Sequence, residues 1–340
     1  PMAIASAGAG AAEAVGGAAS FPAMSGKPRS QRASERGRAA AARAAREREL
    51  AEEVDVVDAG SREHYADGAL YDYEYRRRRA DVSFYRELAR RRLGGPGRIL
   101  ELGCGSGRVT VPLARDGHAV IGLDQSTAML RRLQARIGTL PRSVAGRITA
   151  VPGDLRAFRV PGEFPLVIAA FNVLEHLYTR VELDACLRCV ADHLEPGGVF
   201  AFDVQLPDLG WLNRDPNRRW AKTRFTDPTT KRAMFYSTNH DYDPVSQIAV
   251  IRLYYDPVDG RTPGRVIKLT QRKYFPAELE ALVAHAGFRV IERFGDFSFG
   301  PLDGTAESQV LICQVPPKPR RKSGQNTVSS TRNSRFPSRI

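Results

Sequence analysis

Residues 99–107 read Ile-Leu-Glu-Leu-Gly-Cys-Gly-Ser-Gly, and this stretch decides the fold of the chain. The run Ile99–Leu102 is short, apolar apart from one acid and followed by glycine, so it predicts a buried parallel strand. Gly103, Gly105 and Gly107 then form a turn. Because glycine tolerates positive φ and has no side chain, the backbone of such a turn can approach a ligand closely.

The segments that follow the turn add two ligand-binding features. Residues 108–114 are predicted to form a helix whose N-terminus faces the ligand. A second apolar strand, residues 119–123, ends at Asp124. A carboxylate at this end of a second strand is placed to accept hydrogen bonds from both hydroxyls of a ribose. The sequence therefore predicts a nucleoside-binding crevice and, with it, an enzyme.

The glycine spacing separates two classes of cofactor. A dinucleotide fingerprint, G-x-G-x-x-G, needs its third glycine at position 108, whereas here it falls at Gly107. Glu101, two residues before the first glycine, also disfavours a pyrophosphate and favours a cationic ligand. The pattern thus argues against a nicotinamide dinucleotide.

The motif resembles the first motif of the class I S-adenosylmethionine (SAM) methyltransferases, E/D-x-G-x-G-x-G, and the resemblance extends over residues 65–314. It implies that the glycine turn holds the methionine part of SAM, that Glu101 lies near its amino group and that Asp124 binds the ribose. It also implies that Asp154 and Leu155 contact the adenine. The full set of cofactor-binding residues expected from it is Tyr71, Glu101, Gly103, Cys104, Gly105, Gly107, Asp124, Gln125, Met129, Asp154, Leu155 and Asn172.

The rest of the chain alternates strand and helix patterns. Residues 147–151, 165–171 and 199–204 predict three more strands, with a helix at 181–194 that ends at Glu195-Pro-Gly-Gly198. After residue 204, three antiparallel strands are predicted at 232–240, 247–256 and 265–274, followed by a helix at 276–286 and strands at 288–294 and 308–314.

The expected fold is therefore α/β: a doubly wound, seven-stranded, mostly parallel sheet of the class I methyltransferase type, with an antiparallel β insertion after the fifth strand. The predicted divisions are a disordered Ala/Arg-rich tail (1–55), a SAM-binding core (56–204), a substrate-covering insertion (205–274), the C-terminal part of the core sheet (275–315) and a disordered basic tail (316–340).

The insertion is rich in large aromatic residues. In similar small-molecule methyltransferases an insertion at this point covers the active site, so these residues are candidates for a substrate pocket. An equally weighted interpretation is that they form the insertion's own core or a homodimer face. The residues concerned are Trp211, Trp220, Phe225, Tyr236 and Tyr255.

The formal net charge of +13 lies mostly in the termini. Residues 1–50 hold 8 basic and 4 acidic side chains, and residues 316–340 hold 7 basic and no acidic ones. The central part therefore holds 36 basic and 34 acidic side chains. The tails are therefore expected to make at most weak contact with RNA, while the central part is not a nucleic-acid-reading surface. Within it, Arg76–Arg79 is one dense basic run, predicted on a helix that leads into residues 81–93.

The four cysteines do not form a disulfide framework or a zinc site. Cys186 and Cys189 are three apart on a predicted helix without a second pair at metal spacing. Reduced thiols favour a cytoplasmic protein, and no stretch is long and apolar enough to span a membrane. Cys104 is expected to supply a small side chain in the glycine turn.

His176 is the candidate catalytic base. It follows the fourth strand, where substrate meets the methyl group in similar enzymes, and an imidazole titrates near neutral pH. The alternative is a histidine that only packs beneath the substrate. Asn172-x-x-Glu175-His176 also resembles the E-x-x-E-H segment that binds a divalent cation in certain O- and RNA methyltransferases, but Asn replaces the first acid, so no metal site is predicted.

An aromatic segment precedes the first helix of the sheet. In similar N-methyltransferases a tyrosine at this place closes over SAM, and Tyr65, Tyr71 and Tyr75 are the candidates, with Tyr71 preferred. The function these patterns favour is transfer of the SAM methyl group, by in-line displacement, to a nitrogen or oxygen of a small molecule. An RNA or protein methyltransferase guided by the basic tails and a SAM-binding protein without catalysis are the alternatives.

Overall fold

The computed structural model describes residues 57, 60 and 62–316. All of them belong to one compact unit, Asp55–Ile340. The two tails predicted to be disordered lie outside the described residues, apart from Pro316, and the predicted domain boundaries remain predictions.

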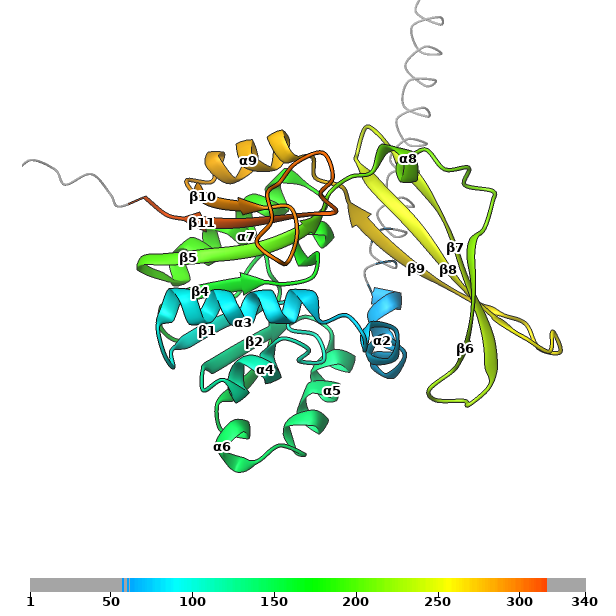
Figure 1. Ribbon diagram of the computed structural model, residues 1–340, viewed down its shortest axis with the longest axis horizontal. Coiled ribbons are helices and arrows are strands. Elements are labelled where there is room, and N and C mark those ends of the chain that lie inside the picture. The colour runs from blue at the N-terminus through cyan, green and yellow to red at the C-terminus, as the bar shows by residue number, and fades with distance from the viewer. Residues whose placement is uncertain (1–56, 58–59, 61, 317–340) are drawn as a thin grey trace, which may run out of the picture. The chain divides into compact units, whose positions relative to one another are not determined.

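A seven-stranded sheet forms the centre of this unit, in the order β10-β11-β5-β4-β1-β2-β3 (Figure 1). All neighbours from β5 to β3 pair in parallel, and β11 runs antiparallel to both β10 and β5. The predicted fold class is thus confirmed. The strands are β1 (Arg98–Leu102), β2 (Ala119–Asp124), β3 (Ile148–Pro152), β4 (Phe164–Ala169), β5 (Leu194–Gln205), β10 (Arg289–Phe294) and β11 (Ser308–Gln314).

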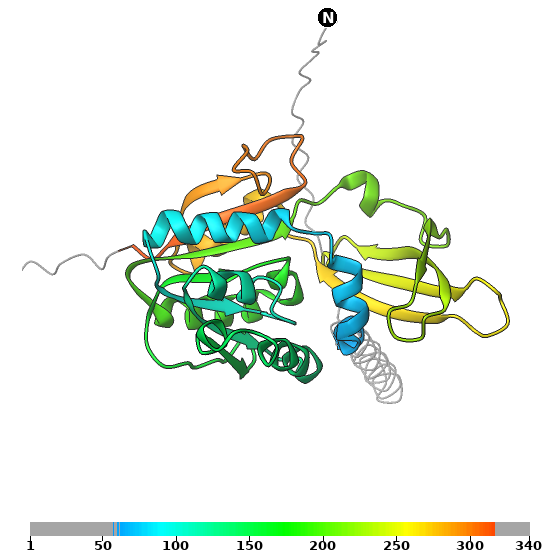
Figure 2. The same cartoon turned by 60° about the horizontal axis from the view of Figure 1, so that its bottom comes forward.

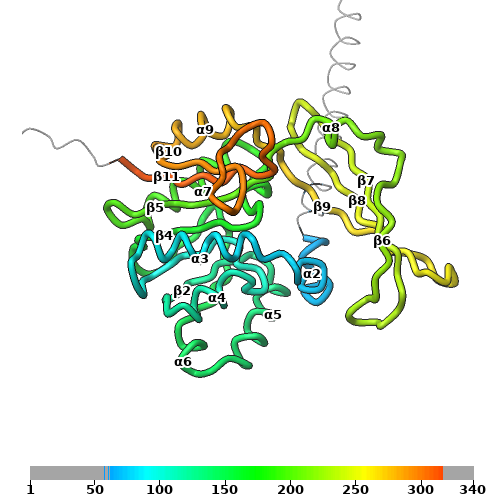
Figure 3. The backbone as a smooth tube through the Cα atoms, in the orientation of Figure 1, coloured from blue at the N-terminus to red at the C-terminus, as the bar shows by residue number. Residues whose placement is uncertain are grey.

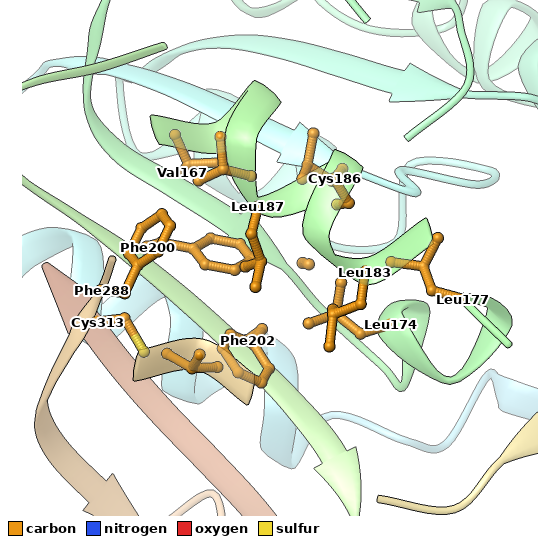
Figure 4. Packing of buried hydrophobic residues seen from close by; sticks show 14 of the residues in the cluster. Val167, Leu174, Leu177, Leu183, Cys186, Leu187, Phe200, Phe202, Phe288 and Cys313 are labelled. Carbon is orange, nitrogen blue, oxygen red and sulfur yellow. The ribbon is translucent and has the colours of Figure 1, made fainter. Parts of the chain in front are cut away.

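Helices cover both faces of the sheet, which explains why β4 is apolar almost throughout: its side chains are buried on either side. On one face α7 (Arg180–His193) packs against β5 through side chains such as Leu187 and Phe200 (Figure 4). Helix α9 (Pro276–His285) adds Leu279 and Val283 to the same apolar cluster. On the other, α3 (Ala80–Leu93) and α4 (Thr110–Arg115) cover the sheet. The remaining helices beside the sheet are α5 (Thr127–Ile137) and α6 (Arg142–Ala145).

The insertion forms a separate four-stranded antiparallel sheet, β6-β7-β8-β9 (Figure 3). Its strands are β6 (Trp220–Thr226), β7 (Ala233–Asp243), β8 (Ile248–Pro257) and β9 (Arg265–Arg272), preceded by the short α8 (Leu209–Leu212). The three expected strands are present as β7, β8 and β9, and the sheet has a fourth strand, β6, that was not expected. β6 was missed because it is an edge strand, mostly exposed, whose Lys222 and Arg224 break the apolar alternation that identifies a half-buried strand.

Three boundaries also differ from the sequence expectation. Helix α4 begins at Thr110, after two more residues of the turn. Strand β5 begins at Leu194, directly after α7, and includes the Glu195-Pro-Gly-Gly198 segment that was expected only to end the helix. Arg76–Arg79 forms the break between α2 (Gly68–Tyr75) and α3, not part of a helix.

Helix α2 lies between the two sheets (Figure 2). Its Asp72 accepts a hydrogen bond from Ser106 of the glycine turn at 2.6 Å and pairs with Arg132 of α5 at 2.7 Å. On its other side, Glu74 accepts a 2.6 Å hydrogen bond from Tyr255 of β8. The helix thereby links the glycine turn to the insertion. Every helix in the described part of the chain is too short or too polar to cross a membrane.

Candidate active site

The glycine turn lies at the carboxyl end of β1, where the strand order reverses between β4 and β2. Gly103, Gly105 and Gly107 have φ values of 64°, 54° and 82°. A Cβ at Gly103 would lie 2.5 Å from Val173, and one at Gly107 would lie 2.4 Å from Leu133, so packing excludes any side chain there. A Cβ at Gly105 would meet nothing within 4 Å. The backbone at Gly105 is therefore the part of the turn open to a ligand.

Asp124 joins the end of β2 to this turn. Its Oδ2 accepts a hydrogen bond from the Gly105 amide at 2.8 Å, and its Oδ1 accepts one from the Ser126 amide at 2.7 Å. Burial raises the pKa of Asp124, while the two amide hydrogen bonds lower it. The carboxylate predicted to bind a ribose is thus held against the open edge of the glycine turn.

Glu101 lies beneath the turn and is only 2% exposed. Its Oε2 accepts a 2.6 Å hydrogen bond from the Thr110 hydroxyl, and burial raises the pKa of the carboxyl to about 8. The positive charge of Arg108 lowers this pKa, but Arg108 is paired with Asp81, and among the described residues no basic group forms an ion pair with Glu101. A buried carboxyl without a cationic partner fits a positively charged ligand above it, as the ammonium of SAM would be.

The other predicted cofactor-binding residues occupy varied surroundings. Cys104 packs against Gly122, where a Cβ would lie 2.9 Å from its sulfur, so its small size is used as expected. Met129 is buried at the start of α5, whereas Gln125 is exposed. Asp154 pairs with Arg156 at 2.6 Å next to the partly buried Leu155. Their contacts with adenine or ribose remain predictions.

Asn172 has the left-handed backbone conformation, with φ of 60°. Its amide donates to Asp203 Oδ2 at 3.2 Å, and the Phe171 amide donates to Oδ1 at 2.8 Å. The Tyr85 hydroxyl donates to the same Oδ1 at 2.6 Å. Asp203 was missed in the sequence, although an acid inside the apolar strand 199–204 is a signal that could have identified it. It fixes the segment that follows β4.

That segment continues as η1 (Val173–His176), one turn of 3-10 helix. Tyr65 O–H lies 2.7 Å from His176 Nε2, and the Tyr178 hydroxyl lies 3.4 Å from Nδ1. Burial lowers the pKa of His176 to about 4, so the imidazole is neutral at neutral pH. The Tyr71 ring lies 5.9 Å from the Tyr65 ring and 4.7 Å from the Tyr75 ring. All three candidate tyrosines therefore gather in one cluster.

Glu175, beside His176, is fully buried and paired with Lys273 of the segment after β9. Lys273 Nζ lies 2.8 Å from Glu175 Oε2, and the exposed fractions of the two side chains are 1% and 0%. The backbone N–H of Gln205 donates to the other carboxylate oxygen of Glu175, Oε1, at 2.8 Å. Both oxygens of Glu175 are thus occupied by protein donors. Nowhere in residues 62–316 do three His, Cys, Asp or Glu side chains gather as a metal site would require.

A cavity of about 770 Å³ opens at this edge of the sheet. Tyr65 lines it and hydrogen-bonds to His176, which is not one of the lining residues. The lining also includes Tyr75, Phe171, Asn172, Gln205 and Gln271.

The five insertion aromatics do not line this cavity. Four of them pack in or against the insertion's own apolar core, and Trp220 lies against Arg214 and Arg218. The alternative interpretation, that these residues form the insertion's own core, therefore describes four of the five. The sheet buries alternate side chains of β7 and β8 on its inner face.

Residues 99–198 match the family profile of a methyltransferase domain. The chain is 31% identical over 148 residues to dTDP-3-amino-3,4,6-trideoxy-alpha-D-glucopyranose N,N-dimethyltransferase of Streptomyces venezuelae, covering 42% of this chain and 59% of that protein. It is 32% identical over 226 residues to putative methyltransferase YqeM of Bacillus subtilis, covering 64% and 82%. The CcbJ methyltransferase from Streptomyces caelestis superposes with a TM-score of 0.59 at 25% identity, covering 70% and 90%.

The fold and the glycine turn together define a SAM-dependent methyltransferase. This chain belongs to the class I SAM-dependent methyltransferase family. Its cofactor is S-adenosylmethionine. The four cysteines are free thiols, as expected.

Proposed function

We propose that this enzyme transfers the SAM methyl group to an amine nitrogen of a small, oxygen-bearing molecule such as an amino sugar. The observation that carries the proposal is the cavity at the carboxyl edge of the sheet, where Tyr65 forms the wall and hydrogen-bonds to the neutral His176. The similarity to sugar N,N-dimethyltransferases supports the choice of a nitrogen acceptor.

We assign the cofactor to the glycine turn. Gly105 and Asp124 would hold the ribose side, and Glu101 would face the positively charged end. When bound there, SAM supplies an electrophilic methyl group on a sulfonium ion. The protein's own part in such a displacement is to align the nucleophile, exclude water and accept a proton.

Tyr65 and His176 are the groups we assign to the amine. The neutral imidazole accepts a hydrogen bond from the Tyr65 hydroxyl, which leaves the lone pairs of the phenol oxygen free to accept one from an amine N–H. An amine held in this way presents its own lone pair in a fixed direction. The proton released after attack can then reach His176 Nε2 through the phenol oxygen. His176 therefore acts behind Tyr65, not in direct contact with the acceptor.

The Glu175–Lys273 ion pair favours this proposal over a metal-dependent O-methyltransferase. In the E-x-x-E-H pattern Glu175 would be the remaining carboxylate ligand, but Lys273 already supplies a positive charge to it. The set of oxygen donors that a Mg²⁺ ion requires is incomplete at Asn172, Glu175 and His176.

The test is methyl transfer from radiolabelled SAM to matched panels of small amines, alcohols and phenols, and to RNA, with and without a chelator. We expect label on amines, unchanged by the chelator. Label confined to phenols, alcohols or RNA, or activity abolished by the chelator and restored by a divalent cation, would overturn the proposal.

A further inference from the structure

Lys273 makes three hydrogen bonds to oxygen atoms in the interior. Its Nζ lies 2.8 Å from Glu175 Oε2, 2.9 Å from Gln205 Oε1 and 2.9 Å from Gln271 Oε1. An ammonium has three protons and no acceptor, so these three oxygens use all its donors. The group joins three parts of the chain, since Glu175 is in η1, Gln205 ends β5 and Gln271 is in β9.

The ammonium also fixes which way the two amides point. Since Lys273 can only donate, each glutamine must turn its carbonyl oxygen toward it and its NH2 group away. Both glutamines line the cavity that Tyr65 borders. Gln205 is exposed. Gln271 Nε2 is also accessible, because it has no hydrogen-bond partner and yet is not one of the fully buried atoms without a partner. Within residues 62–316 no hydrogen bond is made by either NH2 group, so the donors of both are available to a ligand.

The charge of the cluster indicates what kind of ligand suits these donors. Glu175 balances Lys273, so the two amides present a neutral donor pair. The cavity is also lined by one cation, Arg78, and two acids, Asp208 and Glu307, so its lining carries no net positive charge. The amide pair therefore suits a hydroxyl or carbonyl oxygen better than an anion, because no excess positive charge repays the desolvation of a carboxylate or phosphate.

We propose that Gln205 and Gln271 form a subsite that binds a hydroxyl or carbonyl oxygen of the methyl acceptor, and that Lys273 is the positioning residue that orients them. This rests on the proposed function, because it assumes that the acceptor occupies the cavity beside Tyr65. The subsite would select amines that carry an oxygen over amines that do not. An acceptor oxygen would take the place of the water that these accessible NH2 groups otherwise bind, whereas an amine without an oxygen would fill the cavity and leave the donors without a partner.

The test compares cyclohexylamine with the aminocyclohexanols, which differ from it by one ring hydroxyl. In the native enzyme we expect kcat/KM to favour at least one aminocyclohexanol by about 10-fold or more. Gln205→Met and Gln271→Met should remove this preference, mainly through KM, and leave cyclohexylamine turnover and SAM affinity within about 2-fold. Gln314→Met is the matched control, since Gln314 is a half-buried glutamine on β11 whose amide bonds only Gly197 O, and it should change neither acceptor.

Lys273→Met tests the orienting ion, and Lys273→Arg tests whether another cation restores the preference. The preference should disappear in Lys273→Met and return in part in Lys273→Arg, with SAM affinity as the check on folding. An unchanged preference in Gln205→Met and Gln271→Met, or a parallel loss on both kinds of acceptor, would overturn the assignment. So would an enzyme that methylates other amines but none of these. If no amine at all is methylated, the proposed function is wrong, and this assignment is wrong with it.

Discussion

The phenol oxygen of Tyr65 lies 2.7 Å from Nε2 of His176, although 111 residues separate the two in the chain. Tyr65 belongs to the segment before α2, and His176 to η1 after β4. The contact closes the N-terminal aromatic segment over the carboxyl edge of the sheet. In the proposed function, His176 acts on the acceptor through this hydroxyl.

The first prediction concerns this pair. His176→Ala should lower kcat by roughly 10²-fold while SAM affinity stays within a few fold, because the proton acceptor is lost but the cofactor residues are not. The loss should shrink at high pH, where the acceptor deprotonates unaided. Tyr65→Phe should act in the same direction, since it removes the link between the cavity and the imidazole. The measurement is kcat against pH for the native enzyme and both variants.

The pKa of His176 sharpens that measurement. Since burial lowers it to about 4, the native profile should show no inflection from this group near 6.5. A flat, pH-independent ratio between native enzyme and His176→Ala would remove the catalytic role. A fall in Tm parallel to the fall in rate would instead identify a packing residue.

The second prediction is that SAM binding releases a proton from Glu101. The pKa of this buried carboxyl is raised to about 8, so it is protonated at pH 7, and a cation above it would stabilise the ionised form. Calorimetric titration with SAM at pH 7, in buffers of different ionisation enthalpy, should report release of nearly one proton. Glu101→Gln should abolish that release. Equal proton release in Glu101→Gln would exclude Glu101 as the source.

The third prediction is that Asp124→Ala weakens SAM binding by about 1 to 3 kcal/mol, the scale of hydrogen bonds to a charged group. The substitution removes the proposed ribose ligand and also the support for the Gly105 amide. Asp154→Ala provides a comparison at the proposed adenine position, where the carboxylate is already paired with Arg156. Isothermal titration measures both, and an unchanged affinity in Asp124→Ala would contradict the assigned site.

The fourth prediction concerns stability at acid pH. Burial lowers the pKa of His64 to about 4, from 6.5 in an unfolded chain. Between these values the unfolded state binds a proton that the folded state does not, so the stability contributed above pH 6.5 is lost as pH falls toward 4. The slope is about 1.4 kcal/mol per pH unit for one such proton.

The check is the difference in unfolding free energy between native enzyme and His64→Gln, measured by denaturant titration from pH 7 to pH 4. Other titrating groups contribute equally to both proteins, so their effects cancel in this difference. One of them is Glu101, whose raised pKa gives a pH dependence opposite to that of His64, with folding less favourable as pH rises. The native enzyme should lose stability more steeply than the variant as the pH falls. Parallel curves would show that His64 is not held neutral by the fold.

The local features of this enzyme were predictable from its sequence. The apolar run, the glycine spacing and Asp124 lie within 26 residues, and each acts through backbone conformation or through its place at a strand end. Residues of this kind are constrained by neighbours in the chain, so their pattern can be read without knowing the tertiary contacts. The alternation of strands and helices also predicts a doubly wound parallel sheet, and its seven-stranded type is what the family resemblance implies.

Only the tertiary structure decided the contacts around the acceptor cavity. Lys273 and Glu175 are 98 residues apart, and nothing in either segment predicts that a lysine ammonium pairs with the carboxylate of Glu175. The same packing of distant elements brings the Tyr65 hydroxyl to His176 and the side-chain oxygens of Gln205 and Gln271 to Lys273. Such hydrogen bonds depend on how distant elements pack, because a side chain's partner is set by three-dimensional proximity, which the spacing of residues along the chain does not encode.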